Sequence, residues 1–107
     1  MEGVVVATDG DFEAEVLHSD VPVLVDFSAD WCAPCRMMES TLEEIAAERA
    51  GDLKVVRVSV DDSPGVATRY RVQGLPTLLL VRDGQPVTRL TGYMSKRKLL
   101  QRLGDLV

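Results

Sequence analysis

Residues 29–36 read Ala-Asp-Trp-Cys-Ala-Pro-Cys-Arg, and this segment constrains the chain most because it holds both of its cysteines and its only tryptophan. Two cysteines separated by two residues can close a small disulfide, hold a metal or exchange electrons. In a small domain this spacing favours redox or metal chemistry over a structural cross-link. The rest of the chain is therefore expected to be a scaffold that presents this segment to a partner.

Length and charge narrow the remaining possibilities. A chain of 107 residues predicts a single domain, 1–107, with its own hydrophobic core. The net charge of −5 argues against nucleic acid or an anionic membrane as the main partner. No apolar run approaches the ~20 residues of a membrane span, and no secretory signal is visible, so a cytoplasmic protein is expected. A mature exported chain would look the same.

The pattern of apolar residues predicts an α/β fold. In chain order we expect strand 4–7, helix 12–17, strand 23–27, helix 34–50, strand 53–61, helix 64–70, strands 77–81 and 87–91 joined at Asp83-Gly84, and a last helix from Ser95 whose apolar side includes Leu106. This order predicts a central mixed sheet of about five strands flanked by about four helices, with a βαβ unit around the cysteines.

Cys32 is the expected nucleophile. Pro34 and the helical pattern after it place Cys32 at the N-cap or first turn, with Cys35 one turn further on the same face. Unpaired N–H groups at a helix start favour a thiolate, so the pKa of Cys32 should lie about one unit below the free value of ~8.5. We expect an exposed Cys32 that attacks a partner disulfide, and a deeper, protonated Cys35 that resolves the mixed disulfide.

Asp26 is the expected proton acceptor for Cys35. It interrupts the apolar run 23–27, on the face opposite Val25 and Phe27. Burial there should raise its pKa, and a carboxyl that titrates near neutrality suits proton transfer. The alternative is that Asp26 forms a purely structural ion pair with Arg57.

These residues resemble the thioredoxin family across essentially the whole chain. The motifs that carry the resemblance are Val-Leu-Val-Asp-Phe at 23–27, Trp-Cys-Ala-Pro-Cys at 31–35, Asp61, Gly-Leu-Pro-Thr at 74–77, Asp-Gly at 83–84 and Gly92. The resemblance to thioredoxin also implies a lowered thiol pKa in the Cys-X-X-Cys motif.

The resemblance implies a thioredoxin fold and protein-disulfide reductase activity with no bound cofactor. The reduced form would be regenerated by a thioredoxin reductase that carries FAD and uses NADPH. It also implies a monomer that docks diverse disulfide-containing proteins, and a cis peptide bond at Pro76 facing the cysteines. The backbone at Leu75 would pair with an extended partner segment. The implied contact residues are Trp31, Ala33, Pro34, Gly74, Leu75, Pro76 and Gly92.

Four positions depart from the family pattern. Ala33 replaces a glycine, and Ser28 replaces a tryptophan. Ser40 stands where the family has a helix-kinking proline, so a straighter helix is expected. Arg57 replaces a lysine, and its permanent charge should hold Asp26 more ionised. These changes affect the redox potential and the range of partners more than the reaction type.

Three alternatives remain open on the sequence. The same fold could serve a disulfide oxidant or isomerase, although Ala-Pro between the cysteines is closer to the reducing type. It could also serve as a non-catalytic binding module in a larger complex. A zinc site would want four protein ligands, and the lone His18 does not complete the set.

Overall fold

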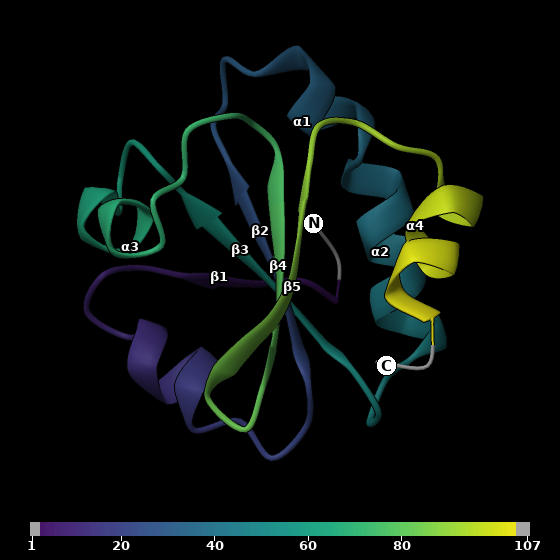
Figure 1. Cartoon of the computed structure of the whole chain (residues 1–107), viewed down its shortest axis with the longest axis horizontal. Helices are drawn as coiled ribbons and strands as arrows, with labels where there is room; N and C mark the ends of the chain where they lie inside the picture. The colour runs from purple at the N-terminus through teal and green to yellow at the C-terminus, as the bar shows by residue number, and fades with distance from the viewer. Residues whose placement is uncertain (1–2, 105–107) are drawn as a thin grey trace.

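A mixed sheet forms the centre of the computed structural model, which describes residues 3–104 (Figure 1). The strand order in these residues is β1-β3-β2-β4-β5, with β1, β3 and β2 parallel and β4 and β5 antiparallel to their neighbours. The strands are β1 (Val5–Ala7), β2 (Val23–Ser28), β3 (Lys54–Ser59), β4 (Thr77–Arg82) and β5 (Gln85–Thr91). The helices are η1 (Glu13–Leu17, π-type), α1 (Ala33–Met37), α2 (Glu39–Glu48), α3 (Pro64–Arg69) and α4 (Lys96–Leu103).

Helices cover both faces of the sheet, and each face has its own core. On one face, Leu24, Leu78 and Leu80 pack with apolar residues of α2 and α4. On the other, Val25, Phe27 and their neighbours pack with residues of η1 and α3. All six residues of β2 are buried, as expected of a central strand. The predicted order of elements and the fold class are confirmed, whereas Leu106 lies outside the described residues.

The turn between β4 and β5 is the one that the sequence predicts. Asp83 and Gly84 both have positive φ, 52° and 78°, which is the requirement of a type I′ hairpin turn. Asp-Gly supplies it at low cost because glycine has no Cβ and aspartate tolerates the left-handed region.

The helix expected over residues 34–50 is divided into α1 and α2, so the prediction of one continuous helix was wrong. The chain leaves the helical pattern at Met38, between α1 and α2, although Ser40 removes the proline expected to cause a kink. The Met38 side chain is fully buried in the core with Leu42 and Ile45, and its N–H bonds the carbonyl of Cys35, three residues back. The break between α1 and α2 therefore lies at a fully buried residue and occurs without a proline at position 40.

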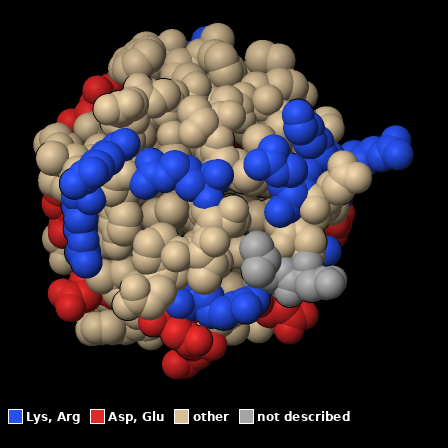
Figure 2. All heavy atoms as spheres, viewed as in Figure 1, with Lys and Arg blue, Asp and Glu red and all other residues tan. Residues whose placement is uncertain are grey.

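Surface charge is unevenly distributed. Figure 2 shows basic side chains across this face, from the side of α3 over β5 to α4, with acidic side chains mainly at its margin. The net charge of −5 is therefore not spread evenly. Within residues 3–104, no helix combines the length and apolar character needed to cross a membrane.

Candidate redox-active site

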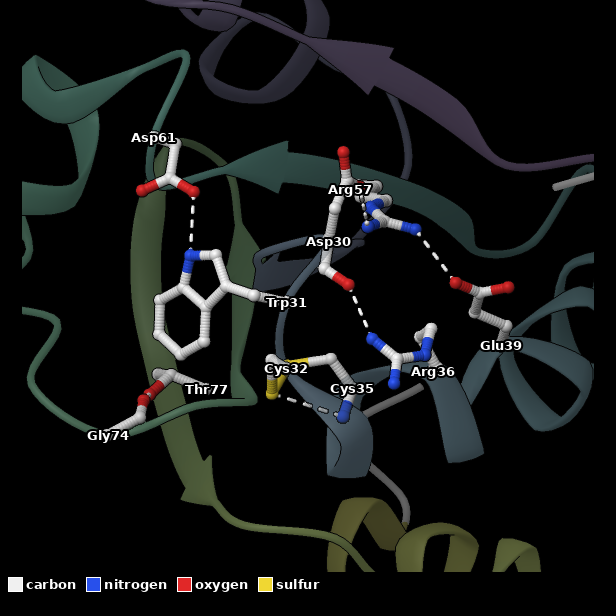
Figure 3. The surroundings of a disulfide bond; sticks show 10 residues. All are labelled: Asp30, Trp31, Cys32, Cys35, Arg36, Glu39, Arg57, Asp61, Gly74 and Thr77. Carbon is white, nitrogen blue, oxygen red and sulfur yellow. Dashed lines mark hydrogen bonds and ion pairs between the residues drawn. A yellow bond between two sulfur atoms is a disulfide. The ribbon is translucent and has the colours of Figure 1, made fainter.

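The end of β2 and the start of α1 hold the cysteine pair. The Cys32 N–H donates to the carbonyl of Ala29 at 3.1 Å, which turns the chain just after the strand. Cys32 is the N-cap of α1, and its sulfur accepts a hydrogen bond from the Cys35 N–H at 3.2 Å (Figure 3). The two residues form a disulfide with a Cα–Cα distance of 5.3 Å. The predicted N-cap position of Cys32 is confirmed.

Exposure of Cys32 is much smaller than predicted. Cys32 is 5% exposed and Cys35 is 2% exposed, so the expectation of one openly exposed sulfur was wrong. Ala29, Val60 and Leu75 pack around the disulfide and cover it. The two cysteines still differ, because Cys32 lines a surface groove whose lining does not include Cys35.

This groove is mostly apolar and has a volume of about 590 Å³. Its lining includes four of the residues expected from the resemblance: Trp31, Ala33, Pro34 and Leu75. Sequence reasoning missed Val60, Val72 and Gln73, which also line it. Val60 directly follows β3, and the other two precede the Gly-Leu-Pro-Thr loop, so their position next to two recognised motifs was the available signal.

Pro76, Gly74 and Gly92 are not among the lining residues of the groove. The Leu75–Pro76 peptide bond is cis, as the resemblance implies, and Pro76 is buried. The carbonyl of Pro76 accepts a hydrogen bond from the Gly92 N–H at 2.8 Å, and the Thr77 hydroxyl donates to the carbonyl of Gly74 at 2.5 Å. These bonds tie the loop that carries Leu75 to the sheet.

Trp31 forms an exposed wall of the groove. Its side chain is 68% exposed, and its indole N–H donates to Asp61 Oδ2 at 2.8 Å (Figure 3). This bond fixes the ring plane beside Cys32. A large, oriented aromatic surface next to a buried sulfur suits contact with an apolar partner segment.

Asp26 belongs to β2, and its side chain lies on the face of the sheet that α2 and α4 cover. Its side chain is 1% exposed, and Oδ1 has no hydrogen-bond partner among the described residues. Burial raises the pKa of Asp26 to about 7, against a smaller lowering by Arg57 and with a further raising contribution from Glu39. The carboxyl therefore changes protonation state near neutral pH, which is the property that the sequence predicted.

Comparisons with known proteins identify the family. The thioredoxin family model matches residues 3–105. The thioredoxin of Mycobacterium tuberculosis is 51% identical over 100 residues, which are 94% of this chain and 86% of that protein. Thioredoxin 1 of Nostoc is 46% identical over 103 residues, 96% of each chain. The bifunctional thioredoxin reductase/thioredoxin of Mycobacterium leprae is 47% identical over 100 residues, 94% of this chain and 22% of that protein.

The chain belongs to the thioredoxin family. With its cysteine pair at disulfide distance, it is a protein-disulfide oxidoreductase of the thioredoxin type.

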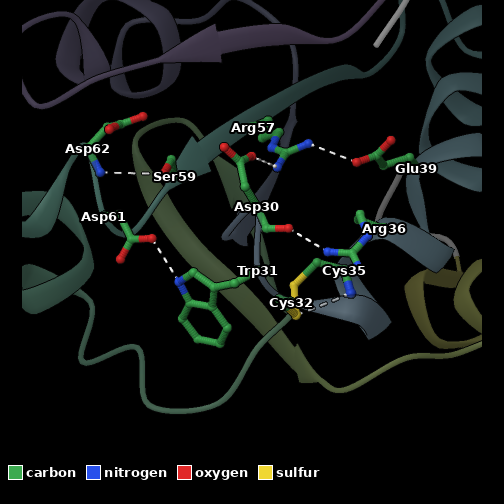
Figure 4. A network of polar contacts seen from close by, with 10 residues as sticks. All are labelled: Asp30, Trp31, Cys32, Cys35, Arg36, Glu39, Arg57, Ser59, Asp61 and Asp62. Carbon is green, nitrogen blue, oxygen red and sulfur yellow. Dashed lines mark hydrogen bonds and ion pairs between the residues drawn. A yellow bond between two sulfur atoms is a disulfide. The ribbon is translucent and has the colours of Figure 1, made fainter.

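Arg57 departs from the thioredoxin pattern and lies at the centre of a small ionic network. In the register of β2 and β3 it is the direct neighbour of Asp26. Its guanidinium contacts Glu39 Oε1 at 3.2 Å and Asp30 Oδ1 at 3.3 Å (Figure 4). Its charge lowers the pKa of Asp26, as predicted, but burial outweighs this effect. No pattern in the sequence indicated the contacts of Arg57 with Asp30 and Glu39.

The zinc alternative finds no support in the described residues. Between residues 3 and 104, no three side chains of the ligating types (His, Cys, Asp, Glu) cluster in a way that could hold a metal ion. His18 is exposed, and its Nε2 lies 3.7 Å from Oε1 of Glu13 on η1.

Proposed function

We propose that this member of the thioredoxin family reduces protein disulfides with Cys32 as the nucleophile, Cys35 as the resolving thiol and Asp26 as the proton acceptor. The observation that carries the proposal is the position of Cys32 at the N-cap of α1, on the lining of an apolar groove. Backbone N–H groups at this position, including that of Cys35, stabilise a thiolate on the Cys32 sulfur.

The reaction has two exchanges. The Cys32 thiolate attacks one sulfur of the partner disulfide, the partner S–S bond breaks, and the partner's released thiolate takes up a proton from solvent. Cys35 then transfers its proton to Asp26 and attacks the Cys32 sulfur of the mixed disulfide. The S–S bond between Cys32 and the partner breaks, and the second partner sulfur leaves as a thiolate that takes up a proton from solvent, while Asp26 returns its proton to solvent. The partner has then gained two electrons and two protons as a dithiol, and this protein is left as the Cys32–Cys35 disulfide. Cys35 lies one helical turn from Cys32, so its thiol has a high effective concentration at the mixed disulfide in the second exchange.

The groove would bind the segment of the partner that carries its disulfide. Trp31, Ala33, Pro34 and Leu75 offer apolar contact. The loop of Gly74 and Pro76, held by the Gly92 N–H and the Thr77 hydroxyl, positions the Leu75 backbone for pairing with an extended chain. Few polar side chains line the groove, which favours transient binding of diverse partners. We also propose that the protein acts as a cytoplasmic monomer, with residues 1–107 as one domain.

The role of Asp26 predicts a pH-dependent second exchange. Asp26→Asn should slow release of the reduced partner from the mixed disulfide by about 10²-fold, because general-base catalysis typically contributes at least that much. Single-turnover kinetics from about pH 5 to 9 would measure it. The step in rate near pH 7 should disappear in the variant. Asp52→Asn, an exposed control, should keep both rate and step. An unchanged rate in Asp26→Asn would exclude Asp26 as the base.

Regeneration is proposed to come from a thioredoxin reductase that carries FAD and uses NADPH. The Mycobacterium leprae relative, a bifunctional thioredoxin reductase/thioredoxin, supports this partnership. The protein should reduce insulin disulfides catalytically when NADPH and a thioredoxin reductase are supplied. Equilibration with glutathione should give a potential more reducing than that pool. A potential at or above the glutathione value would instead favour an oxidant or isomerase.

A further inference from the structure

The Arg57 guanidinium lies between two carboxylates on the side of the sheet where Asp26 is buried. Nη1 contacts Glu39 at the start of α2, and Nη2 contacts Asp30 just after β2 (Figures 3 and 4). The Arg57 side chain is only 15% exposed. A largely buried cation that is the sheet neighbour of Asp26 would be drawn to that carboxylate unless other anions hold it.

The two anchors differ in strength. The Asp30 side chain is fully solvated, at 101% exposure, so water screens its interaction with Arg57. The Glu39 side chain is 35% exposed, and its contact with Arg57 is correspondingly less screened. The Arg36 guanidinium donates to the backbone carbonyl of Asp30 and so fixes the segment that carries the weaker anchor. Glu39 is therefore the principal partner in this pair.

The charged and titratable groups around Asp26 come from several elements. Arg57 of β3 and Glu39 of α2 act on Asp26 through their charges, and Asp30, after β2, is linked to them by its contact with Arg57. The proposed function adds Cys35 of α1, which titrates once the disulfide is reduced. On β4 the register neighbour of Asp26 is Leu78, which is apolar. The protonation equilibrium of Asp26 therefore depends on how close the Arg57 guanidinium lies to its carboxyl group.

We propose that Glu39 is a positioning residue that holds the Arg57 guanidinium away from Asp26, so that Asp26 can take up the Cys35 proton at neutral pH. Asp30 is a weaker second anchor. The proposal rests on the proposed role of Asp26. Its physical basis is competition for one cation. If Glu39 lost its charge, Arg57 would shift toward Asp26 and favour the ionised carboxylate. An ionised Asp26 paired with arginine is a poorer base for a thiol.

Glu39→Gln tests the proposal with a change of one charge and almost no change of shape. In the reduced protein, the pKa of Asp26 followed by NMR of its side-chain carboxyl carbon should fall by about half a unit or more. The pH midpoint of partner release should move down by a similar amount. Glu43→Gln is the matched control, because Glu43 lies one turn further along α2 and its substitution removes the same charge. Glu43→Gln should lower the pKa of Asp26 much less than Glu39→Gln does. Thermal unfolding checks that each variant is folded.

A double variant separates the positioning of Arg57 by Glu39 from direct repulsion between the Glu39 and Asp26 carboxylates. With Arg57→Met, removal of the Glu39 charge should shift the pKa of Asp26 by less than half as much as it does when Arg57 is present. An equal shift in both backgrounds, or no shift in Glu39→Gln, would overturn the positioning role. The NMR measurement does not require Asp26 to act in catalysis. A shifted pKa with an unchanged rate in Asp26→Asn would therefore count against the proposed function and leave the geometry of Arg57 intact.

Discussion

Cys35→Ser should leave a protein that attacks one partner disulfide and then stops. The Cys32 sulfur would still lie at the N-cap of α1 on the groove, so the first exchange proceeds. Without a second thiol inside the protein, resolution depends on thiols from solution. An internal thiol is worth a very large effective concentration, so catalytic reduction of insulin should fall by on the order of 10³-fold or more. Mass spectrometry should find a stoichiometric covalent adduct with a disulfide-containing partner.

The matching variant, Cys32→Ser, gives the opposite result and assigns the roles. Cys35 is 2% exposed, and the groove lining does not include it, so it should be a poor nucleophile toward a protein disulfide. We expect neither turnover nor adduct in this variant. If Cys32→Ser formed the adduct and Cys35→Ser did not, the order of attack and resolution would be reversed. If both variants retained turnover, the chemistry would lie elsewhere.

The sequence predicted those features of the site that follow from local rules. The apolar run 23–27 identified a buried central strand, and alternation placed Asp26 opposite Val25 and Phe27, as the two cores confirm. Proline in the first helical turn predicted Cys32 as the N-cap. These predictions depend on residues close together in the chain, where periodicity and capping fix the geometry.

The features that the sequence did not predict depend on packing between distant segments. The burial of Cys32 comes from Val60 and Leu75, which belong to other loops. The break at Met38 lies at a residue fully buried in the core and occurs although Ser40 stands in place of the family proline. The contact of Arg57 with Glu39 joins β3 to α2 across eighteen sequence positions. A pattern of charges along the chain does not tell which acid an arginine will reach once the sheet has formed.

Burial of Asp26 should make the protein less stable as pH rises from about 4 to about 7. The unfolded carboxyl titrates near 3.8, and the folded one near 7. Below pH 3.8 both states are protonated, and burial has no charge cost. Between the two values the folded state holds a proton that the unfolded state has lost, so the free energy of unfolding falls with rising pH. The loss levels off above pH 7 at about 4 kcal/mol, since one pKa unit corresponds to about 1.4 kcal/mol.

Asp26→Asn should remove this slope. Urea unfolding of the disulfide form, followed from about pH 4 to pH 9, avoids titration of the cysteines. The difference between the two proteins isolates Asp26, because the other acids, such as Asp11 with its lowered pKa, contribute equally to both. Relative to the unmodified protein, the variant should gain stability steadily up to about pH 7. A typical domain is stable by only about 5–15 kcal/mol, so a catalytic carboxyl here would cost a large share of the total. If the free energies of unfolding of the two proteins changed with pH in parallel, Asp26 would be ionised in the folded protein over this whole pH range. It would then carry its charge as a structural partner of Arg57, and the proton of Cys35 would need another acceptor.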